Sequence, residues 1–254
     1  MMANLVLFIL ALVALLVIFE SIRMGWRLSI SRRMTLSILR FERINQAAPL
    51  RMLLIGDSTG YGTGTSDSRF SITGRLASDF PQAHIENWSK TGISLGGVVR
   101  ILKAAPEQKR KFDVLIIMAG GIDVVYHTPL KKVRLRLKEV LERAKHRGIK
   151  VIVVMPNNPG LAPLYHFPLS ALQLRRAQLA KKIFVDVARE EKIAYVSLYR
   201  ESADVLSERN LYAQDKTHPN DEGYRLWYEQ IREAVHQAVT QLPASISRGK
   251  VTVC

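Results

Sequence analysis

The sequence contains a single cysteine, at position 254, so the chain cannot form a disulfide bond within itself. Histidine and cysteine do not cluster at metal-ligand spacings, and we expect neither a metal ion nor another cofactor. No Gly-Lys-Ser or Gly-Lys-Thr follows the glycine-rich stretches, which argues against a phosphate-binding loop. Internal repeats and low-complexity tracts are also lacking. These absences favour one domain whose chemistry is carried by its own side chains.

Acidic residues are scarce: 22 Asp and Glu stand against 37 Lys and Arg, which gives a net charge of +15. A basic surface suits either nucleic acid or an anionic membrane. The Lys and Arg residues are spread along helix-like stretches at 131–150 and 175–182, and no nucleic-acid-binding motif occurs. We therefore expect solvated helix faces and contact with anionic membrane lipids, and we expect no nucleic-acid partner.

No basic residue precedes the long apolar run near the N-terminus, which covers residues 5–19 without interruption. With residues 1–3 included, the run is long enough to cross a bilayer, which takes roughly 20 residues. A cleaved signal peptide would carry a basic start and small residues at its cleavage site. Both are missing around Phe19-Glu20-Ser21-Ile22. The sequence therefore predicts an uncleaved transmembrane anchor over residues 1–20.

Arginine is concentrated directly after the apolar run, at Arg23, Arg27, Arg32, Arg33, Arg40 and Arg43. Because basic flanks stay on the cytoplasmic side, this predicts a single-pass protein of a bacterial inner membrane with its main domain in the cytoplasm. Apolar residues are interleaved with these arginines over residues 24–44. Two interpretations are open: a basic amphipathic juxtamembrane segment (21–46) lying on anionic lipid, or a helix packed on the domain.

Short apolar runs alternate with longer amphipathic stretches over residues 47–242. The runs predict strands at 52–55, 84–87, 114–118, 149–155 and 193–197, and the stretches predict helices at 70–79, 95–104, 130–147, 170–191 and 221–241. The third and fourth runs are apolar at nearly every position, as in strands covered on both faces. This predicts a three-layer α/β/α sandwich with a mainly five-stranded parallel sheet, flavodoxin-like, followed by a basic tail at 243–254.

Two short motifs carry groups suited to catalysis. Gly56-Asp57-Ser58-Thr59-Gly60 follows the first predicted strand, and Asp215-Lys216-Thr217-His218 lies in a polar loop after the fifth. Loops that follow parallel strands meet at one edge of the sheet. Serine, histidine and aspartate at that edge fit a nucleophile, its base and an orienting carboxylate. The first motif also fits the elbow of α/β-hydrolases, but there the elbow lies mid-chain and the Asp and His occupy separate loops.

These motifs resemble the SGNH, or GDSL-type, hydrolase family over roughly residues 51–241. Gly56-Asp57-Ser58 is similar to the family's first block, which implies Ser58 as the nucleophile. Residues 87–92 resemble the second block, which implies that Gly92 helps to form the oxyanion hole. Gly120-Gly121-Ile122-Asp123 stands where the third block, near oxyanion and substrate, is expected, and Asp215-x-x-His218 matches the last. The resemblance implies an esterase or lipase that acts on lipid esters, thioesters or acetyl esters.

The third block departs from the family pattern at Ile122, where the family carries an asparagine. Isoleucine cannot donate a hydrogen bond to the oxyanion, and the loss of one such donor costs roughly 10²–10³ in kcat in other hydrolases. Asn157 or Asn158 in the next loop could replace it. A membrane-anchored ester hydrolase is therefore the first interpretation, and a vestigial module that binds acyl or glycan ligands at the membrane is the alternative. The sequence identifies no protein partner.

Overall fold

The computed structural model of the chain describes residues 2–106, 111–198 and 209–243. The predicted tail therefore lies outside the described residues from position 244 onward, Cys254 included. Five parallel strands form one sheet in the order β2-β1-β3-β4-β5, with bounds β1 Arg51–Gly56, β2 His84–Asn87, β3 Phe112–Met118, β4 Gly148–Met155 and β5 Ala194–Ser197. The strand order reverses between β1 and β3, and ligands bind at such a reversal in open α/β sheets.

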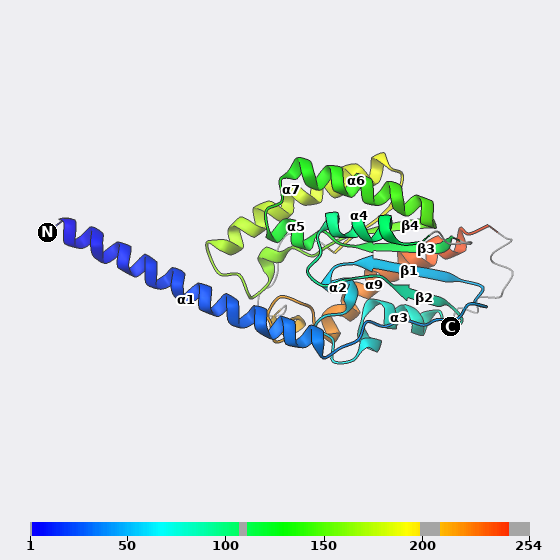
Figure 1. Cartoon of the computed structure of the whole chain (residues 1–254), viewed down its shortest axis with the longest axis horizontal. Coiled ribbons are helices and arrows are strands. Elements are labelled where there is room, and N and C mark those ends of the chain that lie inside the picture. Colours follow the sequence, from blue (N-terminus) through cyan, green and yellow to red (C-terminus); the bar gives the residue numbers. More distant parts are fainter. Residues whose placement is uncertain (1, 107–110, 199–208, 244–254) are drawn as a thin grey trace.

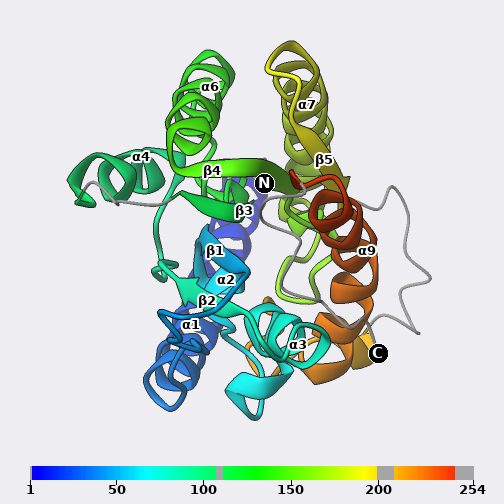
Figure 2. The same ribbon diagram turned by 90° about the vertical axis from the view of Figure 1, so that its right-hand side faces the viewer.

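Helices cover both faces of the sheet, as the fully apolar strands predict. One face is packed by α4 (Leu95–Ala104), α6 (Leu130–Arg147) and α7 (Leu169–Glu190), and the other by α3 (Ile72–Asp79) and α9 (Asp221–Thr240). Figure 2 shows these two helical layers on opposite sides of the strands. All seven residues of β3 are buried. The three-layer sandwich with a five-stranded parallel sheet is thereby confirmed.

Several short elements are present that the sequence pattern did not predict. They are the helices α2 (Ser58–Tyr61) and α5 (Gly121–Val125) and the 3-10 turns η1 (Ser68–Phe70), η2 (Pro159–Leu161) and η3 (Arg209–Leu211). None of them is long enough to show a helical period of apolar residues, which is the signal that identifies longer helices. Two of them, α2 and α5, directly follow β1 and β3, so they lie beside the reversal in strand order.

The helix α1 (Met2–Leu36) extends away from the sandwich (Figure 1). Its apolar residues between Leu5 and Phe19 are exposed in the isolated chain. By length and composition, residues 4–36 could cross a membrane, although signal sequences share both properties. An uninterrupted row of exposed apolar side chains is costly in water, so this half of α1 is suited to an apolar environment.

The second half of α1 differs from the expected separate amphipathic segment. The helix is continuous through position 20 and ends at Leu36, not near residue 44. Half-buried residues recur every three or four positions, at Arg23, Arg27, Ile30 and Met34, so one side of the helix faces the domain. Arg23 donates to the carbonyl oxygen of Leu164 at 2.7 Å, and Arg27 donates to that of Gln214 at 2.6 Å. This favours the interpretation of a helix packed on the domain.

Candidate active site

Ser58 begins helix α2 directly after β1, at the carboxyl edge of the sheet. Asp57 caps this helix, because its Oδ1 atom accepts hydrogen bonds from the backbone N–H and the hydroxyl of Thr59. The end of β1 can approach β3 closely because residue 56 is glycine. A Cβ atom on Gly56 would lie 2.1 Å from the carbonyl oxygen of Met118. Gly56 and Asp57 therefore fix the turn on which Ser58 stands.

The serine, histidine and aspartate of the two motifs form one hydrogen-bonded chain. Ser58 Oγ lies 2.8 Å from His218 Nε2, and His218 Nδ1 lies 2.5 Å from Asp215 Oδ2. The side chain of His218 is 12% exposed and that of Asp215 is 1% exposed. Ser58 is half-buried, so a ligand can reach its hydroxyl group, whereas the Asp215 carboxylate is buried on the far side of the imidazole. This geometry can pass the hydroxyl proton to the imidazole.

The surroundings of Asp215 keep its carboxylate ionised. Burial on its own would raise the pKa of Asp215, but the hydrogen bond and electrostatic attraction of His218, with two backbone N–H groups, hold that pKa below its usual range. The N–H groups of Thr217 and His218 both donate to Oδ1 at 3.0 Å, which leaves Oδ2 for the imidazole. An ionised carboxylate in this position can orient the imidazole and stabilise its protonated form.

Residues 213–219, called here the Asp–His loop, form a tight turn with its own internal hydrogen bonds. The N–H of Ala213 donates to the carbonyl oxygen of His218 at 2.8 Å, which closes the turn. Lys216 has a φ of +62°, a left-handed conformation that costs a non-glycine residue roughly 1–2 kcal/mol. Directly after the loop, the Asn220 side chain accepts from the N–H groups of Glu222 and Gly223 and caps α9. The surrounding packing therefore sets the conformation of the loop.

Residues expected at the oxyanion lie on two further loops at the same edge. Gly92 is exposed, with a φ of +71°. Gly120 is buried, has a φ of +117° and precedes α5, whose first turn has no side-chain cap. A Cβ atom on Gly121 would lie 3.5 Å from Asp57 Oδ2, and Ile122 is the half-buried second residue of α5. The third block therefore stands directly beside the turn that carries Ser58.

Two buried carboxylates brace these loops. Asp57 is 3% exposed, and burial raises its pKa against the opposing hydrogen bonds from Thr59. Asp123 accepts a hydrogen bond from the N–H of Leu95 at 2.7 Å, which supplies α4 with the cap that Ser94 does not make. Burial also raises the pKa of Asp123. Asp123 therefore holds the loop before α4 in place, and a contact of this residue with substrate stays a prediction.

Asn87 is a structural residue of the site to which sequence reasoning assigned no role. Its side-chain amide donates to the carbonyl oxygen of Gly60 at 2.9 Å, and its Oδ1 atom accepts from the N–H of Ser89 at 3.0 Å. It thereby ties the loop after β2 to the end of α2. The available signal was a polar residue at the end of a predicted strand. Its bonding partners depend on tertiary contacts that the sequence does not display.

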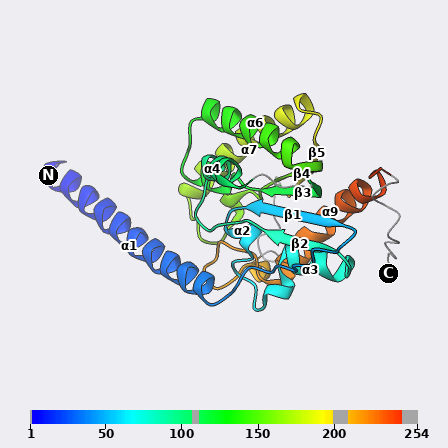
Figure 3. The same cartoon turned by 45° about the vertical axis from the view of Figure 1, so that its right-hand side comes forward.

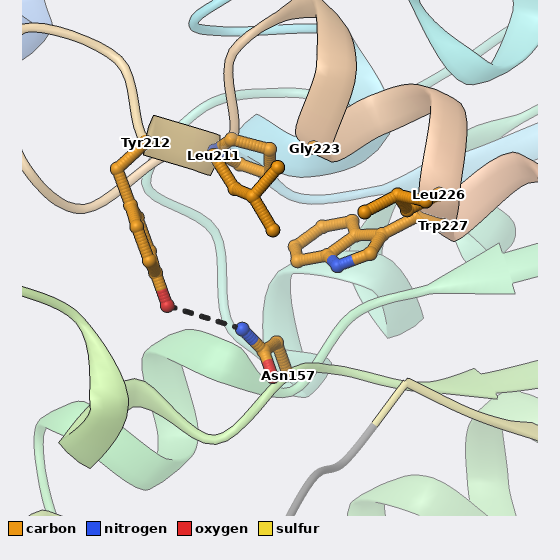
Figure 4. Close-up of a pocket in the computed structure, with 7 residues that line it drawn as sticks. Asn157, Leu211, Tyr212, Gly223, Leu226 and Trp227 are labelled. Atoms are coloured by element: carbon orange, nitrogen blue, oxygen red, sulfur yellow. Dashed lines mark hydrogen bonds between the residues drawn. The ribbon is translucent and has the colours of Figure 1, made fainter. Parts of the chain in front are cut away.

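A shallow pocket of about 350 Å³, its open mouth included, lies beside the Asp–His loop (Figure 4). Its walls are Asn157, Leu211, Tyr212, Pro219, Gly223, Leu226 and Trp227. Pro219 follows His218 directly, but neither Ser58 nor His218 lines this pocket. The Asn157 amide donates to the Tyr212 hydroxyl at 3.4 Å, and Asn158 Oδ1 accepts from the N–H of Gly160. Each of these asparagine side chains is thus bonded to a neighbour, and the possibility that either replaces the missing oxyanion donor stays a prediction.

The described part of the chain holds no group of three or more His, Cys, Asp or Glu side chains that could bind a metal ion. An activated hydroxyl, an imidazole and a carboxylate in contact are the components of acyl transfer through a serine ester.

Solved structures resemble this fold over about three quarters of the chain. A lipolytic protein of the G-D-S-L family from Veillonella parvula has a TM-score of 0.61 at 18% identity, covering 74% of this chain and 99% of that one. The structure of TesA has a TM-score of 0.58 at 20% identity, with coverage of 74% and 99%. The psychrotrophic esterase EstA from Pseudoalteromonas sp., inhibited by monoethylphosphonate, has a TM-score of 0.57 at 18% identity, with coverage of 75% and 99%. These identities show the fold alone.

Among curated proteins no match to the sequence was found. The family model of the GDSL-like lipase/acylhydrolase family, in contrast, matches residues 54–226. This range includes Ser58, Asp215 and His218, and it covers well over half of the 254 residues. The chain therefore belongs to the GDSL-like lipase/acylhydrolase family.

Proposed function

We propose that this protein is a membrane-anchored serine hydrolase that cleaves carboxylic esters through an acyl-enzyme on Ser58. The observation that carries the proposal is the unbroken hydrogen-bonded chain from Ser58 through His218 to Asp215. Membership of a lipase and acylhydrolase family supports the reaction class. Lipid esters, thioesters and acetyl esters are suitable substrates, because all three present an acyl carbon to the serine.

The reaction follows from this geometry in two halves. His218 Nε2 takes the hydroxyl proton as Ser58 Oγ attacks the ester carbon, and the tetrahedral intermediate collapses when the leaving alcohol receives that proton. Water then attacks the acyl-serine, again giving a proton to His218, which returns it to Ser58 as the acid departs. Asp215 remains ionised throughout and stabilises the imidazolium that forms twice. No cofactor or oxidant is needed to balance either half.

The oxyanion requires donors that are already in place. The N–H of Ser58 is the first of helix α2, where no intrahelical acceptor exists, so it is a suitable donor. Gly92 is the second donor in our proposal, and the uncapped first turn of α5, at Gly121 and Ile122, stands on the other side of the Ser58 turn. Ile122 brings no side-chain donor, which favours the alternative of a weakly active or vestigial module.

The membrane anchor is the second part of the proposal. Residues 4–36 of α1 are long and apolar enough to span a bilayer, and the arginines that follow the apolar run support a cytoplasmic position of the hydrolase domain. The contacts of Arg23 and Arg27 with the domain support a fixed position of the domain next to the anchor.

A fluorophosphonate probe separates the two candidate functions, because it forms a stable bond only with an activated serine. We expect the full-length protein in membranes to be labelled, and the Ser58→Ala variant not to be labelled. Ser66→Ala is a matched control, since Ser66 is bonded to Asp221 and not to the imidazole. Absence of labelling in a folded wild-type protein, or full labelling of Ser58→Ala, would refute the proposed function.

A further inference from the structure

The contacts between α1 and the domain begin directly after the apolar run of this helix. The apolar run ends at Phe19. Directly afterwards, Glu20 lies 3.4 Å from His166 Nδ1, and Arg23 donates to the carbonyl oxygen of Leu164. The loop that carries Leu164 and His166 follows β4 and leads into α7. This loop is therefore tied to α1 at the level where a spanning helix would emerge from the hydrocarbon.

The same part of the domain carries exposed apolar side chains. Phe167 is 84% exposed and Tyr126 is 72% exposed, and Leu169 and Leu172 in the first turn of α7 are exposed as well. Gln173 joins the two segments by donating to the carbonyl oxygen of Val125 at 3.2 Å. We call Tyr126, Phe167, Leu169 and Leu172 the apolar tip. Figures 1 and 3 show the start of α7, in yellow-green, as the part of the domain that reaches furthest toward the N-terminal end of α1.

The loops of the apolar tip are also connected to the Asp–His loop. The N–H of Leu164 donates to the carbonyl oxygen of Lys216 at 3.0 Å. Arg27 of α1 donates to the carbonyl oxygen of Gln214, the residue before Asp215. Arg27 follows Glu20 by seven residues, which is roughly 10 Å along a helix. The Asp–His loop is therefore tied to α1 only about two helical turns beyond the end of the apolar run.

We propose that the apolar tip inserts into the same membrane leaflet from which α1 emerges, so that the candidate active site faces the bilayer surface. The partner of this surface is the lipid bilayer itself, and the site then takes its ester from an amphiphile in that leaflet. The choice of substrate rests on the proposed function, whereas the insertion of the tip does not.

Three features favour a bilayer over another occupant. The loop that leads into the tip contacts α1, through His166 with Glu20 and through Leu164 with Arg23, so a membrane that holds the apolar run lies next to the tip. Aromatic and aliphatic side chains dominate the tip, and Trp26 on α1, which is exposed, stands near the same level, as aromatic residues do at membrane interfaces. The exposed Arg175 lies one turn beyond Leu172, where it can meet anionic headgroups.

Insertion is tested with the full-length protein in vesicles of phosphatidylethanolamine and phosphatidylglycerol. In a Cys254→Ser background, Phe167→Cys is labelled with an environment-sensitive fluorophore, and Leu135→Cys is the control, since Leu135 is 60% exposed on α6. We expect a blue-shifted emission for position 167 that lipids with a quencher on the acyl chain reduce, and no such effect at position 135. Equal quenching at both positions overturns the proposal. A blue shift at position 167 that grows with the amount of protein per vesicle and is not reduced by the lipid quencher also overturns the proposal. That result would mean that a second copy of the chain covers the apolar tip.

Two esters, one in the membrane and one in solution, test whether the site takes its substrate from the leaflet. Phe167→Ser combined with Leu172→Ser should lower hydrolysis of a phospholipid in the same vesicle roughly tenfold, because two large apolar side chains lose their apolar surroundings. Hydrolysis of p-nitrophenyl acetate in solution should be unchanged, and Leu135→Ser should affect neither ester. An equal loss with both esters, or no loss with either, contradicts the proposed orientation. A wild-type protein that cleaves neither ester but shows quenching at position 167 refutes the proposed function and leaves the insertion standing.

Discussion

Gly64 packs directly against the loop that carries His218: a Cβ atom at position 64 would lie 3.1 Å from the Cβ of His218 and 2.2 Å from the carbonyl oxygen of Pro219. The φ of Gly64 is +106°, which side chains with a Cβ rarely adopt. Gly64→Ala should therefore destabilise the protein by about 2 kcal/mol and displace His218 from Ser58, lowering kcat more than it changes KM. Urea denaturation and ester kinetics measure the two effects.

Gly25→Ala is the matched control for this prediction, because nothing lies within 4 Å of a Cβ atom at Gly25 on α1. Alanine is favoured over glycine in a helix, so this variant should lose neither stability nor activity. If Gly64→Ala behaves like Gly25→Ala, the tight contact between the Gly64 loop and the Asp–His loop is not present in solution.

Removal of each member of the hydrogen-bonded chain should have a graded effect on ester turnover. Ser58→Ala and His218→Ala should each lower kcat by several orders of magnitude, because the first removes the nucleophile and the second its base. Asp215→Asn should lower kcat by the same amount or less, since the imidazole keeps a partner but loses the charge that stabilises it. The double variant Ser58→Ala with His218→Ala should be little worse than either alone. Additive losses would show that the two side chains act separately.

The depressed pKa of Asp215 predicts how this residue contributes to stability as the pH changes. A carboxyl whose pKa is lower in the folded state stabilises the fold above its unfolded value of about 3.9. This contribution is lost as the pH falls through the lower, folded value. The difference in unfolding free energy between wild type and Asp215→Asn should therefore be largest near neutral pH and shrink below about pH 4. A difference that stays constant from pH 7 to pH 3 would show that the charge of Asp215 does not stabilise the fold.

The sheet could be predicted because its strands are covered on both faces, so Val114 to Met118 and the strand that ends at Met155 are apolar at nearly every position. The order of elements then follows from their alternation along the chain. The positions of the two motifs after predicted strands indicated that Ser58 and His218 lie at the same edge of the sheet. In the structure the two side chains are within hydrogen-bond distance. That they catalyse a reaction stays a prediction.

Other features depend on tertiary contacts that periodicity does not encode. Arginines such as Arg23 and Arg27 suit anionic lipid and backbone carbonyl groups equally well, so the sequence left both interpretations of this segment open. The short helices α2 and α5 contain too few residues to show a period. Asp123 lies within the third block, and the hydrogen bond that its carboxylate accepts from Leu95 depends on where α4 begins.

The arginine-rich flank of α1 predicts which side of the membrane holds the hydrolase domain. A membrane-impermeant maleimide should not label Cys254 in intact spheroplasts and should label it after permeabilisation. Cys254→Ser is the blank, and Asn4→Cys in that background should be labelled in intact spheroplasts, because it precedes the apolar run. Labelling of Cys254 in intact cells, without labelling of Asn4→Cys, would reverse the proposed orientation.

Ile122 is the position at which an added side chain tests the oxyanion site. It is half-buried as the second residue of α5, beside Gly121 and the Ser58 turn. Ile122→Asn adds a donor near the charge that develops on the carbonyl oxygen, so the gain is larger in the transition state than in the ground state. We expect kcat to rise by up to roughly a hundredfold with a smaller change in KM. Ile122→Val is the control, since it removes one methylene and adds no donor.

The same substitution carries a structural cost that has to be measured beside the kinetics. An amide that is buried without a partner costs about 1–3 kcal/mol, and the loss of the isoleucine side chain adds to this. A variant that unfolds more easily but turns over faster per folded molecule still supports the prediction, because donor and stability are separate effects. A stable Ile122→Asn protein with unchanged or lower kcat contradicts it. That result would mean that backbone groups at Ser58, Gly92 and the start of α5 already complete the oxyanion site, or that this side chain faces away from it.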